Sequence, residues 1–141
     1  MDVFTSEQIA GQRLMVGFDG LSLSEDLKYL IDTLKVGGLI LFKRNVSLPE
    51  QIADLCASAQ AHAAACGQPP LFIAIDQEGG RVARLGPPFT QFPGNPSMNS
   101  VSDADSFAEI TARELGRVGI NMNMAPVLDD GGGPFLSTEK V

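Results

Sequence analysis

The sequence has few of the features that mark exported, disulfide-bonded or nucleic-acid-binding proteins. Its 141 residues include two cysteines and one histidine, and acidic residues outnumber basic ones to give a formal charge of −7. Cys56 and Cys66 fall in one expected helix, where a rise of about 1.5 Å per residue separates them by roughly 15 Å, too far for a disulfide. Two unpaired thiols are typical of the reducing cytoplasm, which is the expected location.

Long apolar runs and basic stripes are also missing. No run approaches the ~18 residues that cross a bilayer, and the N-terminus, MDVFTSEQIAGQRL, has no basic region before an apolar core. The charged residues are scattered along the chain, so we expect neither a membrane nor a nucleic acid as partner. The length and the hydrophobic content of 44% predict one globular core.

Short apolar runs typical of buried strands alternate with amphipathic helical patterns. The expected strands are residues 13–18, 38–42, 71–75 and 120–129. The expected helices begin after a cap at Ser24, at Ser47 or Pro49, and after a cap at Ser102 or Asp103. Unbroken apolar strands separated by single helices predict an α/β fold with a parallel sheet that is covered on both faces.

Two architectures fit this alternation. An open doubly wound sheet suits the length, but neither of the glycine-rich phosphate-binding motifs is present. A (β/α)8 TIM barrel needs roughly 250 residues, so this chain would form its first half, with about four parallel strands and three intervening helices. A half barrel leaves an open edge at each end of its sheet, and self-association into a homo-oligomer is the simplest remedy.

Polar side chains follow each expected strand, at the end that faces the ligand in both architectures. They are Asp19, Lys43 to Asn45, Asp76 to Glu78, and Asp129 with Asp130. Single polar residues in such loops are most often solvated or cap a helix. The stretch IAIDQEGGRVARL stands apart, because a buried strand runs directly into Asp76 and then into two further polar residues, two glycines and two arginines.

Asp76 and Glu78 can first be interpreted as the two carboxylates of a retaining glycosidase, which lie about 5–5.5 Å apart. Residues i and i+2 of a strand point to one side, with Cα atoms roughly 6.5–7 Å apart. Both groups would then approach the sugar from one side, whereas the two catalytic carboxylates must flank the scissile bond. The Gly79-Gly80 pair predicts a sharp turn, in which Glu78 instead holds the loop or pairs with Arg81.

Four segments, GGLILFKRNV, IDQEGGRVARL, PPFTQFPGNPSM and NMAPVLD, occur in this order and together resemble the N-terminal part of glycoside hydrolase family 3. Within that family they resemble the bacterial β-N-acetylglucosaminidases of cell-wall recycling. The resemblance extends from about Gly17 to Asp129 and implies one truncated barrel domain, residues 1–141, with a divergent tail at 131–141. It implies exo-acting, retaining hydrolysis of terminal β-linked N-acetylglucosamine, with no cofactor and no metal.

The resemblance also implies the roles of single residues. Asp76 would accept hydrogen bonds from hydroxyls of the terminal sugar, and Arg84 would be a second substrate-binding residue, both chemically suited to polyhydroxylated ligands. The family's nucleophilic aspartate and its acid/base histidine lie further downstream. The one histidine here, His62, falls on a helix, and we expect it to be a surface or packing residue.

No catalytic residue is therefore assigned to this chain, which we expect to be inactive alone. The resemblance leaves two alternatives open. One is a fragment of a family 3 β-glucosidase, and the other is a non-catalytic sugar-binding or assembly module.

Overall fold

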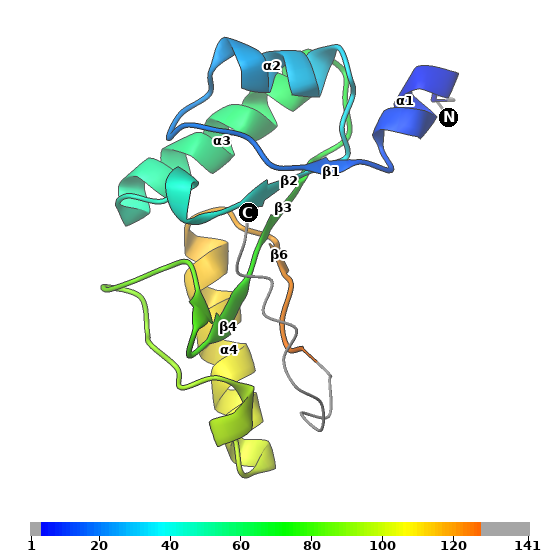
Figure 1. Cartoon of the computed structure of the whole chain (residues 1–141). Coiled ribbons are helices and arrows are strands. Elements are labelled where there is room, and N and C mark those ends of the chain that lie inside the picture. The colour runs from blue at the N-terminus through cyan, green and yellow to red at the C-terminus, as the bar shows by residue number, and fades with distance from the viewer. Residues whose placement is uncertain (1–3, 128–141) are drawn as a thin grey trace.

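A computed structural model describes residues 4–127 of the chain. Its elements are α1 Ser6–Gly11, β1 Met15–Val16, α2 Glu25–Asp32, β2 Gly38–Leu41, the 3-10 turn η1 Lys43–Asn45, α3 Pro49–Ala65, β3 Phe72–Ile75, β4 Gln77–Gly79, β5 Val82–Ala83, the 3-10 turn η2 Asn95–Ser97, α4 Val101–Arg117 and β6 Met122–Asn123. Figure 1 shows α2 and α3 lying together beside the sheet.

The sheet is parallel throughout, and its strands lie in the order β1-β2-β3-β6. The two central strands pair over their whole length, with Leu39 opposite Ile73 and Leu41 opposite Ile75. A helix separates each strand of this sheet from the next. The expected α/β fold, the first half of a (β/α)8 TIM barrel, is confirmed in its four parallel strands and three intervening helices.

The core forms where the strands and helices present the apolar positions that the sequence pattern predicts. Leu27 and Ile31 on α2 and Ile52 on α3 are fully buried. They join residues of the strands and loops in one cluster, whose largest buried side chains are Leu27, Ile31, Val36, Leu39, Leu41, Ile52, Leu71, Ile73, Ile75 and Leu85. On β2 and β3, Leu39, Leu41, Ile73 and Ile75 are buried in this cluster, whereas Phe72 is exposed.

Two of the three expected helix starts are confirmed. The Ser24 side chain accepts a hydrogen bond from the backbone of Leu27, and α3 begins at Pro49, the second of its two expected starts. The expected cap of α4 at Ser102 or Asp103 is wrong, because Ser100 caps the helix by accepting from the Asp103 backbone. Asp103 is the third residue of α4, and its carboxylate accepts from the backbone of Asn99.

Both edge strands are shorter than the apolar runs that predict them. β1 has only Met15 and Val16, and Leu14 before it is half exposed. β6 has only Met122 and Asn123, although flanking backbone groups of Asn121 and Met124 also bond to β3. The structure adds two elements that the patterns do not predict, the short helix α1 and the β4-β5 hairpin.

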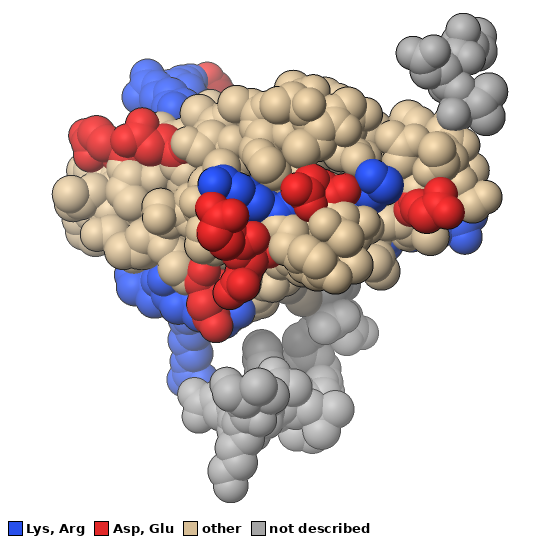
Figure 2. Space-filling view, turned by 90° about the horizontal axis from the view of Figure 1, so that it is seen from above, with Lys and Arg blue, Asp and Glu red and all other residues tan. Residues whose placement is uncertain are grey.

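Charged groups of both signs share the surface. On the face seen in Figure 2, basic side chains lie next to acidic ones and form no continuous stripe. Across residues 4–127, each helix falls short of the length or the apolarity that crossing a bilayer demands. Cys56 and Cys66 are both free thiols, as expected from their spacing.

Candidate functional site

The structure brings Asp76 and Arg84 together at the carboxyl end of β3. Asp76 directly follows the last residue of the strand, and the β4-β5 hairpin folds back so that Arg84 comes beside it. The Arg84 guanidinium Nη2 lies 3.1 Å from Asp76 Oδ2, and their side chains are 29% and 24% exposed. The two residues predicted to bind substrate therefore form one partly buried ion pair that is still open to solvent.

Gln77 fixes the backbone that carries this pair. Its buried side-chain Oε1 accepts hydrogen bonds from the backbone N–H groups of Arg84 (2.9 Å) and Leu85 (3.0 Å), while its Nε2 donates to the Leu85 carbonyl. Gln77 directly follows Asp76 in the chain. Its side chain therefore holds the backbone of Arg84 close to Asp76 at the end of β3.

The two glycines of the motif allow the hairpin to pack closely against the following loop. Gly79 and Gly80 both have positive φ values, of 87° and 60°. A Cβ atom on Gly79 would lie 2.8 Å from the Phe92 carbonyl oxygen, and one on Gly80 would lie 2.6 Å from that of Pro93. The expected sharp turn is confirmed, and only glycine fits both its backbone angles and its surroundings.

Glu78 takes part in the electrostatics of the site. Partial burial raises the pKa of Glu78, the negative charge of Asp76 raises it further, and the positive charge of Arg84 opposes both. The expected pairing of Glu78 with Arg81 is wrong, because the ion pairs found among residues 4–127 do not include Arg81, which is exposed. The ionised form of Glu78 is therefore disfavoured at this position, although Arg84 offsets part of the effect.

One polar atom of the Arg84 side chain has no hydrogen-bond partner among the described residues. This atom is Nε, which is buried, while Nη2 is used by Asp76. The backbone carbonyl of Arg84 accepts a hydrogen bond from Lys43 Nζ at 3.2 Å. Lys43 lies just after β2, so the end of that strand is also close to Arg84. Three neighbouring segments of the chain therefore meet around Arg84.

The other polar residues at the ends of β1 and β2 mainly support the backbone. Asn45 is fully buried, and its side chain bonds to the backbone of Phe18, Gly20 and Phe42. Arg44 forms an ion pair with Asp19 at 2.7 Å and also lies over the Phe42 ring. These contacts tie the two loops together, whereas the candidates Asp129 and Asp130 lie outside the described residues.

His62 is remote from this end of the sheet. It lies in the last turn of α3, partly buried, and its ring faces α2. The sequence patterns list Gln77 only as one of the polar residues after a strand, and they do not single out Asn123. The side-chain amide of Asn123 bonds to both backbone groups of Gln77, and the only local signal is that a polar side chain interrupts an apolar run.

The chain is similar to known glycoside hydrolases over most of its length. Residues 5–134 match the model of the glycosyl hydrolase family 3 N-terminal domain. A β-hexosaminidase of Alkalilimnicola ehrlichii is 39% identical over 129 residues, which cover 85% of this chain and 36% of that protein. A β-hexosaminidase of Pseudomonas aeruginosa is 37% identical over 120 residues, covering 82% of this chain and 35% of that protein.

Solved structures agree with the sequence comparison. The glycoside hydrolase family 3 β-N-acetylglucosaminidase from Paenibacillus sp. str. FPU-7 superposes with a TM-score of 0.85 at 44% identity, covering 88% of this chain and 24% of that one. The β-N-acetylhexosaminidase from Beutenbergia cavernae has a TM-score of 0.76 at 32% identity, covering 90% of this chain and 39% of that one. This chain spans about a third of the length of the curated relatives that it matches. With its half-barrel sheet and matching motif, the chain belongs to glycoside hydrolase family 3, in whose N-terminal domain it lies.

Proposed function

We propose that this chain supplies the sugar-binding N-terminal part of an exo-acting, retaining β-N-acetylglucosaminidase that removes terminal β-linked N-acetylglucosamine. The observation that carries the proposal is the Asp76–Arg84 ion pair at the carboxyl end of β3. This is the end of the sheet at which barrel enzymes bind their substrates. The names of the relatives, β-hexosaminidase and β-N-acetylglucosaminidase, support the choice of sugar.

In this proposal Asp76 accepts hydrogen bonds from two sugar hydroxyls, because an ionised carboxylate has two oxygens with several lone pairs. Arg84 orients Asp76 through its Nη2, and another N–H group of its guanidinium donates to the sugar. Glu78 has a raised pKa but lies on the same hairpin as Arg84, so we assign it no catalytic role. The nucleophile and the acid/base belong to a later part of the family's barrel, and the isolated chain is proposed to be inactive.

We further propose that residues 1–141 belong to one barrel domain and that the whole enzyme acts in cytoplasmic peptidoglycan recycling. Two free thiols support a reducing compartment. The resemblance of the IDQEGGRVARL segment to the cell-wall recycling branch of the family supports the pathway.

A chimeric enzyme tests the activity. Residues 5–127 would replace the matching part of the Alkalilimnicola ehrlichii β-hexosaminidase, and hydrolysis of p-nitrophenyl N-acetyl-β-glucosaminide would be compared with that of the matching β-glucoside. We expect hydrolysis of the first substrate only. An inactive but folded chimera would contradict the proposal, and a preference for the glucoside would favour the β-glucosidase alternative.

Variants of the chimera test the two binding residues. Asp76→Ala removes two charged hydrogen bonds to the sugar and should lower kcat/KM about 100-fold or more. Arg84→Met should lower it by about tenfold or more, since Asp76 loses its partner. Arg81→Met is the matched control, because Arg81 is an exposed arginine on the same hairpin. Equal losses at Arg81 and Arg84 would exclude the assigned roles.

The uncovered part of the half barrel favours a second candidate, an assembly module. A groove of 890 Å³ runs between α4 and β6, and it is lined by residues that include Phe107, Thr111, Leu115, Asn123 and Pro126. β1 and β6 are the edge strands of the sheet. Sedimentation velocity over a range of concentrations tests this, since a chain that associates through these edges sediments as a dimer or larger species and a module that does not associate remains a monomer.

A further inference from the structure

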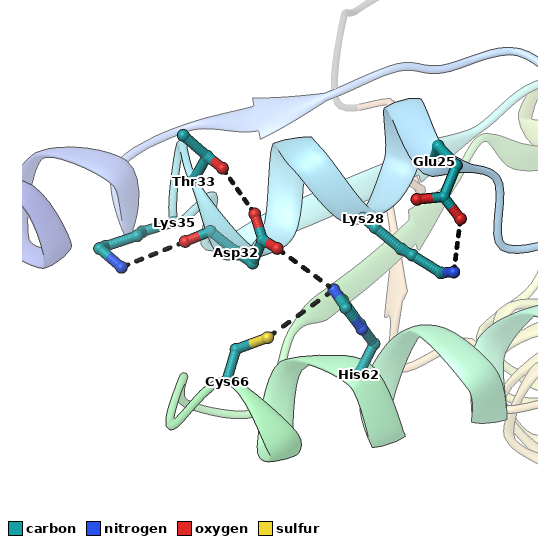
Figure 3. A network of polar contacts seen from close by, with 7 residues as sticks. All are labelled: Glu25, Lys28, Asp32, Thr33, Lys35, His62 and Cys66. Carbon is teal, nitrogen blue, oxygen red and sulfur yellow. Dashed lines mark hydrogen bonds and ion pairs between the residues drawn. The ribbon is translucent and has the colours of Figure 1, made fainter.

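Three side chains that commonly bind metals converge where α2 and α3 end. Asp32 is the last residue of α2, His62 lies in the last turn of α3, and Cys66 is the C-terminal cap of α3. Figure 3 shows the three side chains pointing toward one another across the gap between the two helices. His62 and Cys66 are four residues apart, so the helical turn places them on one face.

The distances within this cluster are close to those of a tetrahedral metal site. His62 Nε2 lies 3.7 Å from Cys66 Sγ and 3.9 Å from Asp32 Oδ2, and all three ligand atoms lie within 4.8 Å of one another. With Zn–N bonds of about 2.0–2.1 Å and Zn–S bonds of about 2.3 Å, a tetrahedral zinc ion separates its nitrogen and sulfur ligands by about 3.6 Å. Its nitrogen and oxygen ligands are about 3.3 Å apart. Asp32 Oδ2 and Cys66 Sγ lie within 4.8 Å, so zinc binding requires the Asp32 side chain, which is 44% exposed, to move toward the two ligands of α3.

The surroundings leave the three ligand atoms free for a cation. The other oxygen of Asp32, Oδ1, accepts a hydrogen bond of 2.6 Å from the Thr33 hydroxyl, which orients the carboxylate. The two lysines near Asp32 are bonded elsewhere, Lys28 to Glu25 and Lys35 to the backbone carbonyl of Asp32. Both helices also direct their C-terminal ends, which carry partial negative charge, toward the cluster.

We propose that Asp32, His62 and Cys66 bind a zinc ion with tetrahedral geometry, with water as the fourth ligand. Asp32 Oδ2, His62 Nε2 and the Cys66 thiolate supply the three bonds, and the thiol proton is released to solvent on binding. This mixed oxygen, nitrogen and sulfur set is one that zinc accepts and that magnesium or calcium does not favour. The sequence patterns predict no metal because Asp32 is distant in the chain from the other two ligands.

The position of the cluster indicates a stabilising role. α2 and α3 end just before β2 and β3 begin, so the cluster lies at the amino end of the strands, whereas Asp76 and Arg84 lie at the carboxyl end. Residues at the amino end of a barrel contribute to stability and not to the reaction. The zinc ion would link α2 to α3, and this proposal is independent of the proposed sugar site.

Cobalt titration of the full 141-residue chain gives a direct test. Co²⁺ in a tetrahedral site with a thiolate ligand has intense visible bands and a near-ultraviolet charge-transfer band from sulfur. We expect both bands to appear, and added Zn²⁺ to abolish them. Cys66→Ser should remove the sulfur band, and His62→Gln and Asp32→Asn should each weaken binding about tenfold or more. Cys56→Ala and Asp26→Asn are the matched controls, since neither residue belongs to the cluster, and both should leave the spectrum unchanged.

A measurement on the unmodified chain makes the test independent of whether the variants fold. Cys56 is only 2% exposed, and burial raises its pKa to about 11, so Cys66 is the thiol expected to react with iodoacetamide. Zn²⁺ should protect Cys66 from alkylation, as identified by mass spectrometry of the peptides, and a chelator should restore the reaction. Equal alkylation of Cys66 with and without Zn²⁺, or a sulfur band that persists in Cys66→Ser, would overturn the proposal.

Discussion

The side-chain amide of Asn123 holds the backbone of Gln77 at both of its polar groups. Asn123 Oδ1 accepts from the Gln77 N–H at 3.0 Å, and Asn123 Nδ2 donates to the Gln77 carbonyl at 3.1 Å. Gln77 in turn binds the backbone of Arg84. A residue of the edge strand β6 therefore positions the hairpin that carries Arg84, although the two are far apart in the sequence.

Asn123→Ala should destabilise the chain by about 1–3 kcal/mol, because it leaves the N–H and the carbonyl of Gln77 without partners. The measurement is urea unfolding followed by circular dichroism. Asn99→Ala is the matched control, since Asn99 is an exposed asparagine that bonds only to nearby loop and cap residues, and it should cost less than about 0.5 kcal/mol. If both variants lower the free energy of unfolding by similar amounts, the hydrogen bonds from Asn123 to Gln77 do not make the predicted contribution to stability.

Gly79→Ala should lower the free energy of unfolding by roughly 2 kcal/mol or more. Alanine at φ 87° is strained, and its Cβ would contact the Phe92 carbonyl oxygen. Gly86→Ala is the comparison, since Gly86 follows the same hairpin, has no positive φ and has open space around its Cα. Thermal unfolding of the two variants should therefore differ clearly. The close packing of the hairpin is disproved if Gly86→Ala lowers stability as much as Gly79→Ala.

The raised pKa of Glu78 predicts a pH-dependent effect of Glu78→Gln. Below pH 4 the carboxyl is protonated in both the folded and the unfolded chain, so the substitution should have little effect. As the pH rises past 4.5, the ordinary pKa of a glutamate, ionisation favours the unfolded chain, and Glu78→Gln should become stabilising by roughly 0.5 kcal/mol or less. Urea unfolding at pH 4 to 8 measures this difference.

Glu7 provides a control of opposite sign for that measurement. A backbone hydrogen bond and the Thr5 hydroxyl lower the pKa of Glu7, so its carboxylate stabilises the folded chain above pH 4.5 and loses this effect as the pH falls. Glu7→Gln should thus be destabilising at neutral pH. Finding the same sign for the two substitutions would rule out the assigned electrostatics.

Removing the charge of Arg84 should raise the pKa of Glu78 further. In Arg84→Met the two carboxylates Asp76 and Glu78 face each other without the cation that now lowers the pKa of Glu78. A carbon-detected NMR titration of the Glu78 carboxyl measures the change, with Arg81→Met as the control. If both variants shift the Glu78 titration equally, the effect is that of net charge and not of the ion pair.

The spacing of apolar residues predicts the sheet and the three main helices, because each of these elements buries its apolar side chains in the core. The alternation of apolar runs and helical stripes is sufficient to place Leu27 and Ile31 in the core. It failed at Ser100, where local hydrogen bonds of a polar side chain decide the start of a helix. It also overestimated β6, since the length of an edge strand depends on the partner strand as well as on its own residues.

The sequence singles out Asp76 and Arg84, which the structure brings together in an ion pair, but it does not predict the contacts that position them. Asp76 stands out because it directly follows a buried strand, and the resemblance to the family motif predicts substrate-binding roles for Asp76 and Arg84. Their contact depends on the Gln77 side chain binding the backbone of Arg84 and Leu85, just after β5, and no local pattern predicts those hydrogen bonds. The cluster of Asp32 with His62 and Cys66 needs the packing of α2 on α3, which only the fold provides.

The order of the strands in the sheet also bears on how this chain folds during synthesis. In the sheet β1-β2-β3-β6 each strand pairs with the sheet strand made just before it. Among residues 4–127, every strand of this sheet can therefore pair as soon as it has been synthesised, because its partner is already present. As the chain leaves the ribosome from its N-terminus, each new strand can add to an edge that already exists, which keeps the exposed apolar surface small at every stage.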